Sequence, residues 1–505
     1  MNRKTTPLLR TALVVLGILA GIRFSAAQQN AEHAVPNVPD GTPSAIDVRL
    51  EQLTSKLDNM SRQLQDSQNA MEAMRAELSA LRSELAEKTL SEEAAKEARS
   101  LKSAVEQLQY QTDVLESEVK QHDQIKVESA SKYPLRISGM LLFTSLVNGG
   151  NPDNIDLPVV AQPRKPNSAA GSLSATARQT VVGIDATGPH LWGARSSADL
   201  NVDFFGGLLY SNYSTAAGSV RLRTAHARMD WENRTLAFAF DRPLLSPWQP
   251  TSWMSVGEPA LAGAGNLWTW SPQLEFTERG ILPEQQLNVA VALIDPSAPG
   301  TSSLTGLRAA DAAERSRQPG YEARIGSTLS WLGHPMNFGA GGYYSRQTYS
   351  FNRHVDAWAG TADWDFSLAN ALELSGQFYR GRAIGGLGGG AFKDYATYNT
   401  YTSLSGLNAE GGWGQLKIKL SPLVEINLAG GQDNAFTSEL RDSDLVLQSD
   451  SYDNLARNQS VYGNLVFRPR AYLLLSTEFR ELRSWPIDGP ANIDRIFGLA
   501  AGYSF

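Results

Sequence analysis

The sequence predicts an all-β protein: a 16-stranded antiparallel transmembrane β-barrel preceded by a long α-helical coiled coil. Two observations lead to this fold class. Apolar residues recur about every 3.5 positions between residues 46 and 130, and they alternate with polar residues in short segments between residues 133 and 505. The first period is that of a coiled-coil seam, and the second is that of a strand with one apolar and one polar face.

Composition excludes several classes of protein. The chain has 505 residues, with 45 Lys and Arg against 52 Asp and Glu, and this mildly acidic balance argues against a nucleic-acid-binding protein. There is no Cys, which excludes disulfides, thiolate metal sites and a Cys nucleophile. No HExxH, GxSxG or GxxxxGK[ST] motif occurs. We therefore expect no cofactor, no metal and no enzymatic activity.

Residues 1–27 have the pattern of a secretory signal peptide. Arg3 and Lys4 supply a basic start, residues 11–22 form a short apolar run, and Ser25 and Ala27 occupy the −3 and −1 positions of a cleavage site. The apolar run is shorter than the ~20 residues that a spanning helix needs. The mature chain is therefore expected outside the cytoplasm, beginning with a Pro-rich linker at 28–45.

Residues 46–130 are predicted to form the coiled coil. The chain has no Gly or Pro between Ile46 and Tyr133, and the seam positions are mostly Leu and Met. An isolated helix cannot bury such a seam, so the segment is expected to pair with other copies of the chain. The same residue types occupy both seam positions, which leaves the number of paired helices open.

Alternation of apolar and polar residues defines the predicted barrel at 133–505. In the segment from Ala194 to Phe204, for example, even-numbered positions form the less polar face and odd-numbered ones are mostly polar. The sixteen segments lie at about 135–147, 174–186, 192–205, 219–231, 234–242, 264–278, 286–294, 320–332, 336–349, 354–367, 371–383, 409–421, 423–433, 457–468, 472–484 and 491–505.

The connections between these segments are of two kinds. Short ones, such as 187–191, 232–233 and 333–335, mostly alternate with long ones rich in Gly, Pro, Ser, Asn and Asp. Short turns at one end and long loops at the other are typical of outer-membrane barrels. An even number of strands returns the C-terminus to the end of the barrel at which the first strand begins, and this end carries the short turns.

A barrel satisfies the physical demands of a membrane better than an open sheet does. In lipid, each backbone polar group needs a partner within the protein, so the sheet must close on itself. Aromatic residues suit the edges of the apolar band. Those expected near the short turns are Trp231, Trp331, Trp364, Phe366, Phe467 and Phe505. A soluble β-sandwich or β-helix, the alternative, explains neither these aromatics nor the unequal connections.

The last strand ends in Phe505, with Tyr503, Ala501, Leu499 and Phe497 on the same face. This pattern resembles the signal by which bacterial barrels are recognised for membrane assembly. Tyr503 and Phe505 are therefore the expected assembly signal, and barrel-assembly machinery is an expected partner.

The whole arrangement is similar to that of the DcaP-like porins of Gram-negative bacteria. This resemblance implies a homotrimer in outer-membrane lipid, with the coiled coil in the periplasm. It also implies a passive channel for small hydrophilic solutes, and a third long loop, here 243–263, that folds inward and narrows the pore. A structural anchor that tethers a coiled coil toward the cell wall is the alternative function, and a soluble secreted adhesin is a third possibility.

Charged side chains on the polar faces of the strands, together with Glu258 in the third long loop, are the candidates for lining a water-filled lumen. Both signs occur among them, which favours a field across the pore over a filter of one sign. The candidates are Arg195, Asp199, Asp203, His226, Arg228, Glu258, Glu322, Arg324, Lys417, Lys419 and Arg480. Strict alternation would turn Arg221 and Arg223 toward lipid, so either their strand has a bulge or they lie at the headgroups.

Overall fold

The computed structural model describes residues 134–164, 166–167, 169, 171–207, 218–281, 286–296, 309–399, 403–444 and 452–505. The predicted signal peptide (1–27), linker (28–45) and coiled coil (46–130) lie outside the described residues. Among the described residues, no helix has the length and apolar character needed to cross a membrane.

Long antiparallel strands make up most of this region. The wall strands are β1 (Leu135–Asn148), β2 (Ser172–Thr176), β3 (Val181–Leu191), β4 (Ala194–Asp203), β5 (Arg221–Asp230), β6 (Arg234–Asp241), β7 (Ser271–Glu278), β8 (Asn288–Ile294), β9 (Gly320–Trp331), β10 (His334–Tyr349), β11 (Arg353–Ala369), β12 (Leu372–Arg382), β15 (Asn408–Ser421), β16 (Val424–Ala435), β17 (Leu455–Arg470), β18 (Leu473–Pro486) and β19 (Asn492–Ser504).

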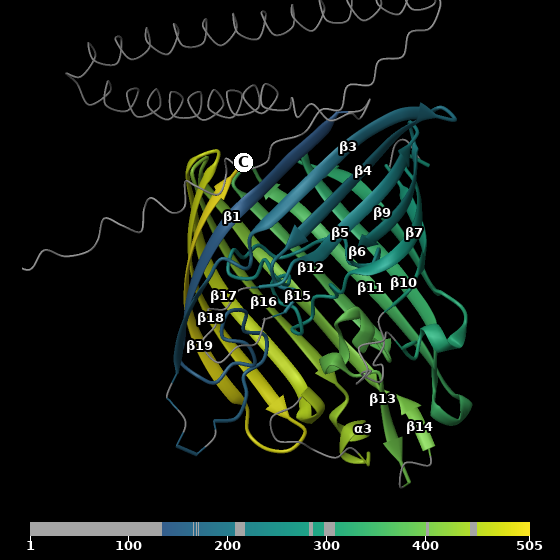
Figure 1. The fold of residues 1–505 in the computed structure, drawn as a ribbon, viewed down its shortest axis with the longest axis vertical. Helices are drawn as coiled ribbons and strands as arrows, with labels where there is room; N and C mark the ends of the chain where they lie inside the picture. The colour runs from purple at the N-terminus through teal and green to yellow at the C-terminus, as the bar shows by residue number, and fades with distance from the viewer. Residues whose placement is uncertain are drawn as a thin grey trace, which may run out of the picture. The chain divides into compact units, whose positions relative to one another are not determined.

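The wall closes into a 16-stranded barrel, as predicted. From β3 onward, wall strands that follow one another in the chain are paired, and β1 pairs with β19 from Met140↔Ser504 to Asn148↔Ile496. Two segments share the other side of β1, because β2 pairs with its C-terminal part and β3 with its N-terminal part. These seventeen segments therefore fill sixteen strand positions (Figure 1).

Shorter elements lie in the long connections at the end of the barrel away from the C-terminus (Figure 1). They include a separate hairpin of β13 and β14. Their bounds are η1 (Glu314–Ser316), η2 (Ser350–Asn352), η3 (Gly385–Leu387), η4 (Gly390–Phe392), β13 (Tyr395–Tyr398), β14 (Ser403–Gly406), α3 (Thr437–Arg441) and η5 (Tyr452–Asn454).

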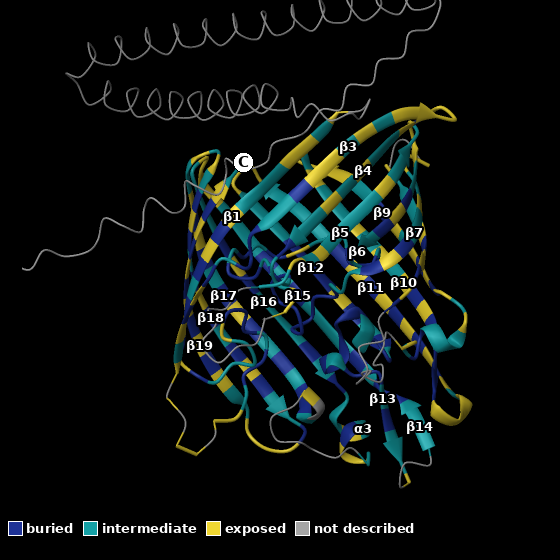
Figure 2. Ribbon diagram, viewed as in Figure 1, coloured by how far each residue is buried: buried dark blue, intermediate teal, exposed yellow. Residues whose placement is uncertain are grey.

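Burial alternates along the strands with a period of two, as the sequence predicts (Figure 2). On β19, Phe497, Leu499 and Tyr503 are exposed on the outer face, whereas Ile496 and Ala500 are buried on the inner face. Trp331 and Phe505 are exposed on the outer face near the short turns. The outer face is therefore an apolar surface with aromatic residues toward one edge, as a lipid-facing wall requires.

Two short turns differ from their predicted positions. β3 runs to Leu191, so residues 187–191 are strand and not the predicted turn. The turn itself is Trp192-Gly193, and a matching turn at Leu332-Gly333 joins β9 to β10. All four residues have positive φ, which is the geometry of the tight hairpin turns that fit twisted strands. Only the Gly in each pair is a common turn residue, so the sequence signal was weak.

The predicted strand at 264–278 is wrong in its first half, because β7 begins only at Ser271. Residues 264–270 belong to the preceding loop. Leu267 and Ala264 are completely buried there, and Leu267 packs in a cluster with Leu245 and Ile384. This stretch is apolar because it packs inside the barrel, and its sequence therefore resembles that of a strand.

Candidate functional site: a loop inside the barrel

The connection between β6 and β7, residues 242–270, folds into the barrel, and we call it the inner loop. This agrees with the inward position that the resemblance implied for 243–263. Glu258 is the single ionisable residue between positions 243 and 270. The inner loop therefore depends on its backbone and on small polar groups for its contacts with the wall.

The inner loop leaves β6 and first contacts the wall strands that follow it in the sheet. The Leu244 amide donates a hydrogen bond to Glu322 Oε2 on β9 at 2.8 Å. Trp248 Nε1 donates to Asp363 Oδ1 on β11 at 3.0 Å. Ser246 Oγ donates to Gln377 Oε1 on β12 at 2.8 Å. These contacts hold the first part of the loop against one side of the wall.

The middle of the loop continues around the wall in the same direction. The Thr251 amide donates to Gln415 Oε1 on β15 at 2.5 Å, and its carbonyl accepts a bond from Asn464 Nδ2 on β17 at 2.8 Å. Ser252 Oγ then donates to Glu478 Oε2 on β18 at 2.6 Å. The loop has by now crossed from β9 to β18.

Gln179, between β2 and β3, receives the loop as it completes the circuit. Its side-chain oxygen accepts the amides of Val256 and Gly257 at 2.6 and 2.8 Å, and its Nε2 donates to the Met254 carbonyl at 3.1 Å. Arg223 on β5 donates to the Val256 carbonyl. The loop thus returns to the strand beside the one from which it left.

The path from 244 to 257 forms a ring inside the barrel. Fourteen residues span at most ~3.6 Å each, or about 50 Å in total. A circle of that length has a diameter of about 16 Å between backbone centres, and the thickness of the chain narrows it further. Residues 244–257 therefore occupy part of the cross-section of the barrel.

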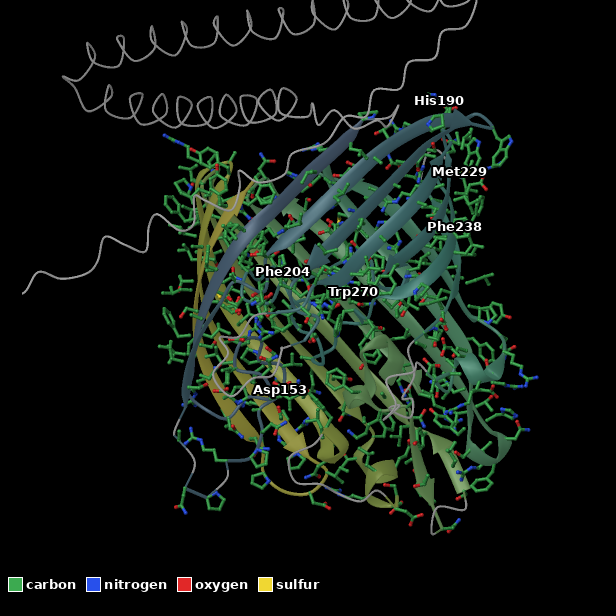
Figure 3. The ribbon with its side chains drawn as sticks, in the orientation of Figure 1. Asp153, His190, Phe204, Met229, Phe238 and Trp270 are labelled. Atoms are coloured by element: carbon green, nitrogen blue, oxygen red, sulfur yellow. The ribbon has the colours of Figure 1, made fainter. Side chains whose placement is uncertain are left out.

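A β-bulge turns both arginines of β5 into the lumen. Asn201 pairs with Thr224 and Val202 with Leu222, so Arg223 has no partner in the register. This settles the open question from the sequence in favour of the bulge. Arg221 Nη2 lies 2.7 Å from Asp203 Oδ2, and both guanidiniums lie near the ring of Trp270, at 5.1 and 5.2 Å. In Figure 3 Trp270 is labelled over the middle of the barrel and Phe238 toward its right-hand side.

A second charged group lies further along β5 toward the short turns. His226 lies between two carboxylates, with Nδ1 2.7 Å from Asp199 Oδ2 and Nε2 3.1 Å from Asp241 Oδ2. Arg228 Nη1 lies 3.4 Å from the other Asp199 oxygen. The Arg228 side chain is 40% exposed and that of Asp241 is 30% exposed. Water therefore reaches this part of the inner wall.

A third charged group lies on the inner wall near the short turns. Lys417 and Lys419 each lie 3.3 Å from a different oxygen of Glu373, and Arg468 lies 3.7 Å from Glu425. Arg195, also near the short-turn end, is exposed and pairs in register with Asp230 of β5. The three groups place both signs of charge on the wall between the ring and this end.

Glu258 directly follows the last residue of the ring, and within the described residues no hydrogen bond or ion pair to its carboxylate is found. The pKa of Glu258 is raised to about 7, chiefly by burial and also by the nearby charge of Asp153, while Arg221 opposes the shift. Burial also raises the pKa of Asp153, whose carboxylate accepts a hydrogen bond from Tyr452. The loop's one acidic side chain is therefore near its titration midpoint at neutral pH.

For three of the candidates, exposure to the lumen has to be corrected. Asp203, Glu322 and Arg480 lie on the inner face as alternation required, but they are at most 5% exposed. The inner loop covers Glu322 and Arg480, and Asp203 is enclosed by Arg221. Arg324 is also largely covered, since it pairs with Asp363 at 2.6 Å beneath Trp248. Glu322 and Arg480 thus bind the inner loop directly. Arg324 binds Asp363, which accepts from Trp248 of the loop, and Asp203 binds Arg221.

The sequence interpretation missed the uncharged anchors of the loop. Gln179, Gln377, Gln415 and Asn464 are buried and bind the loop backbone or Ser246. Their signal was present, because three of them occupy polar faces of predicted strands. Charge was the criterion for a lumen-lining residue, and the side-chain amides of these four residues carry none. No group of three or more potential metal ligands occurs among the described residues.

Solved structures of outer-membrane proteins match the described part of the chain. The outer membrane channel DcaP of Acinetobacter baumannii is 17% identical, with a TM-score of 0.55 over 75% of this chain and 99% of that chain. The described part of the chain has the fold of this channel.

Two further matches are weaker. OprB of Pseudomonas putida is 12% identical, with a TM-score of 0.45 over 74% of this chain and 94% of that chain. An anion-selective porin from Comamonas acidovorans is 10% identical, with a TM-score of 0.44 over 74% of this chain and all of that chain. No family model matches the sequence, and no curated protein matches it.

Proposed function

We propose that the protein is an outer-membrane porin, a passive diffusion channel for small hydrophilic solutes. The observation that carries the proposal is the closed wall of sixteen strands, whose inner face carries partly exposed side chains of both charges beside the inner loop. A wall of sixteen strands encloses enough space for water, whereas one of eight would be filled by side chains. The fold shared with the DcaP channel supports the same conclusion.

Charge on the inner wall supports selection among solutes by electrostatics. Arg228, Asp241 and the lysines around Glu373 are partly exposed toward the lumen and carry both signs. Such side chains act on a solute at close range, where little water screens them. In this proposal Arg195, Asp199, His226, Arg228, Lys417 and Lys419 line the pathway, and Glu258 is the charged group next to the ring.

The remaining parts of the proposal rest on the sequence. The coiled coil at 46–130 would extend into the periplasm and join three chains into a homotrimer. The short turns would face the periplasm, and the long connections would face outward. Tyr503 and Phe505 would mark the chain for the barrel-assembly machinery.

Planar-bilayer recording of the purified protein tests this function. Stable, stepwise currents that grow linearly with voltage are expected, and a salt gradient would give a reversal potential that reports the sign of selectivity. Deleting residues 245–268 and joining the ends with a short Gly-Ser linker should enlarge each step. A protein that inserts but passes no current, with or without the inner loop, would instead be a membrane anchor for the coiled coil.

A further inference from the structure

Three arginines gather on the outer face of β17, β18 and β19, at the end of these strands away from the short turns. They are Arg457, Arg483 and Arg495, and with Glu481 we call them the outer arginine cluster. The strand register pairs Glu481 with Arg495. The next outward-facing pair, one step closer to the short turns, is Phe479 and Phe497. Both phenylalanines are exposed. The cluster therefore lies at the edge of the apolar outer face.

The cluster carries more positive charge than its one carboxylate offsets. Glu481 accepts from Arg483 Nε at 2.6 Å and from Arg495 Nε at 2.9 Å. Arg457 stacks over Trp485 at 3.8 Å, and within the described residues no carboxylate contacts it. The side chains of Arg483 and Arg495 are 48% and 65% exposed. Three arginines and one glutamate leave two positive charges at a lipid-facing position.

An apolar hollow of about 550 Å³ lies on the same face, nearer the short turns. Phe143, Leu465 and Leu499 are among the exposed side chains that line it, and the smaller side chains of Thr477 and Ala501 leave room between them. Arg495 precedes Leu499 by four residues and Ala501 by six. At ~3.4 Å per residue, the hollow begins about 14–20 Å from the arginine along the strand.

This separation is comparable with one leaflet of a bilayer, whose hydrocarbon core is about 30 Å thick across both leaflets. Guanidinium groups bind phosphate through paired, charge-assisted hydrogen bonds. Basic clusters beside an apolar surface are the usual recognition sites for anionic lipid headgroups. A lipid with its phosphate at Arg483 and Arg495 would extend an acyl chain into the hollow.

We propose that this face holds a phosphorylated lipid of the outer leaflet, with the outer arginine cluster as its headgroup site and the hollow as its acyl site. The proposal rests on the outer-membrane location proposed above, but not on solute passage. A free anion would leave the hollow unused. A second copy of the chain would have to supply the missing negative charge, whereas a lipid phosphate supplies it directly.

Native mass spectrometry of the full-length protein in detergent tests the proposal. The probe is a phosphorylated disaccharide lipid of the lipid A type, compared with the same lipid after its phosphates are removed. We expect the wild-type protein to retain the phosphorylated form at least ten times better. The double variant Arg483→Gln/Arg495→Gln should lose this preference, and Thr477→Phe, which fills the hollow, should weaken retention of the lipid.

Arg346→Gln is the matched control, because Arg346 is also exposed on the outer face but pairs one-to-one with Asp356. It should retain the lipid as the wild type does. Equal retention by the double variant would overturn the proposal, as would full competition by inorganic phosphate, which would indicate a simple anion site. A double variant that changes the oligomer mass but not lipid retention would mark an interface between copies. Unchanged bilayer currents would show that each variant is folded.

Discussion

Arg480 and Glu478 lie side by side on the inner face of β18, with Nη2 of the arginine 2.6 Å from Oε1 of the glutamate. Their side chains are 6% and 2% exposed. Both also bind the inner loop: Glu478 accepts from Ser252, and Arg480 donates to Ser255 at 2.7 Å. This buried pair therefore holds two serines of the ring against β18.

Replacing Arg480 by Met should therefore release the ring from β18. The change leaves the Glu478 carboxylate buried without its cation, which typically costs about 3–5 kcal/mol. We expect larger and noisier single-channel currents in planar bilayers, and a lower unfolding temperature. Arg441→Met, which breaks an exposed pair with Asp488, is the control and should leave both measurements unchanged. Wild-type currents from Arg480→Met would mean that this pair does not hold the ring.

Asp203→Asn should shift the channel toward anions. Asp203 is fully buried and binds Arg221 through two hydrogen bonds, at 3.1 and 2.7 Å. Removing its charge leaves Arg221 and Arg223 without their nearest counter-charge beside the ring. The reversal potential in a tenfold salt gradient should move in the anion-selective direction. Asp488→Asn removes one negative charge far from the ring and is the control. An equal shift of the reversal potential in that variant would show that the position of Asp203 beside the ring does not cause the effect.

Acidification should remove a negative charge next to the ring. A carboxyl group is charged above its pKa, so Glu258, with a pKa of about 7, should be mostly charged at pH 8 and mostly neutral at pH 6. Selectivity for cations should therefore fall as the pH is lowered through 7. Glu258→Gln should show the low-pH selectivity at both pH values. If that variant still responds to pH as the wild type does, another group is responsible, and Asp153 is the first to examine.

The sequence predicted most of the wall because alternation is a local property of a half-buried strand. The face that holds Ala198, Leu200 and Val202 was assigned correctly for this reason. Alternation alone placed Arg223 on the wrong face, because a single extra residue in β5 reverses the face of each residue beyond it. The apolar stretch around Leu267 was assigned to a strand because interior packing and lipid exposure select similar residues.

The site was harder to predict than the wall. Inward orientation follows from alternation, but burial beneath a loop depends on contacts between residues that are far apart in the chain. Arg480 and Ser255, for example, are separated by 225 positions. Gln179 lies outside any regular strand, between β2 and β3, so no period could identify it as an anchor of the loop. Only the folded structure brings these groups together.

Deleting residues 46–126 tests the role proposed for the coiled coil. We expect the barrel to insert into membranes, because the strands that close its wall begin at Leu135. Assembly efficiency or trimer stability should fall, since the pairing seam is lost. Heat-modifiable gel mobility and analytical ultracentrifugation would measure the two effects. Normal yields of wild-type trimers would refute this role for the segment.

The ring also has a consequence for how such a channel could change its size limit during evolution. Both ends of residues 242–270 are fixed to adjacent strands. Residues 244–257 follow the wall from β9 to β5, and the loop then turns back to β17, where Asn458 donates to the Gly263 carbonyl. In this arrangement the contour length of residues 244–257, and not the circumference of the wall, limits the opening that they can enclose. Inserting one or two residues near Thr251 would widen this opening in an unchanged barrel, and deleting one or two residues there would narrow it.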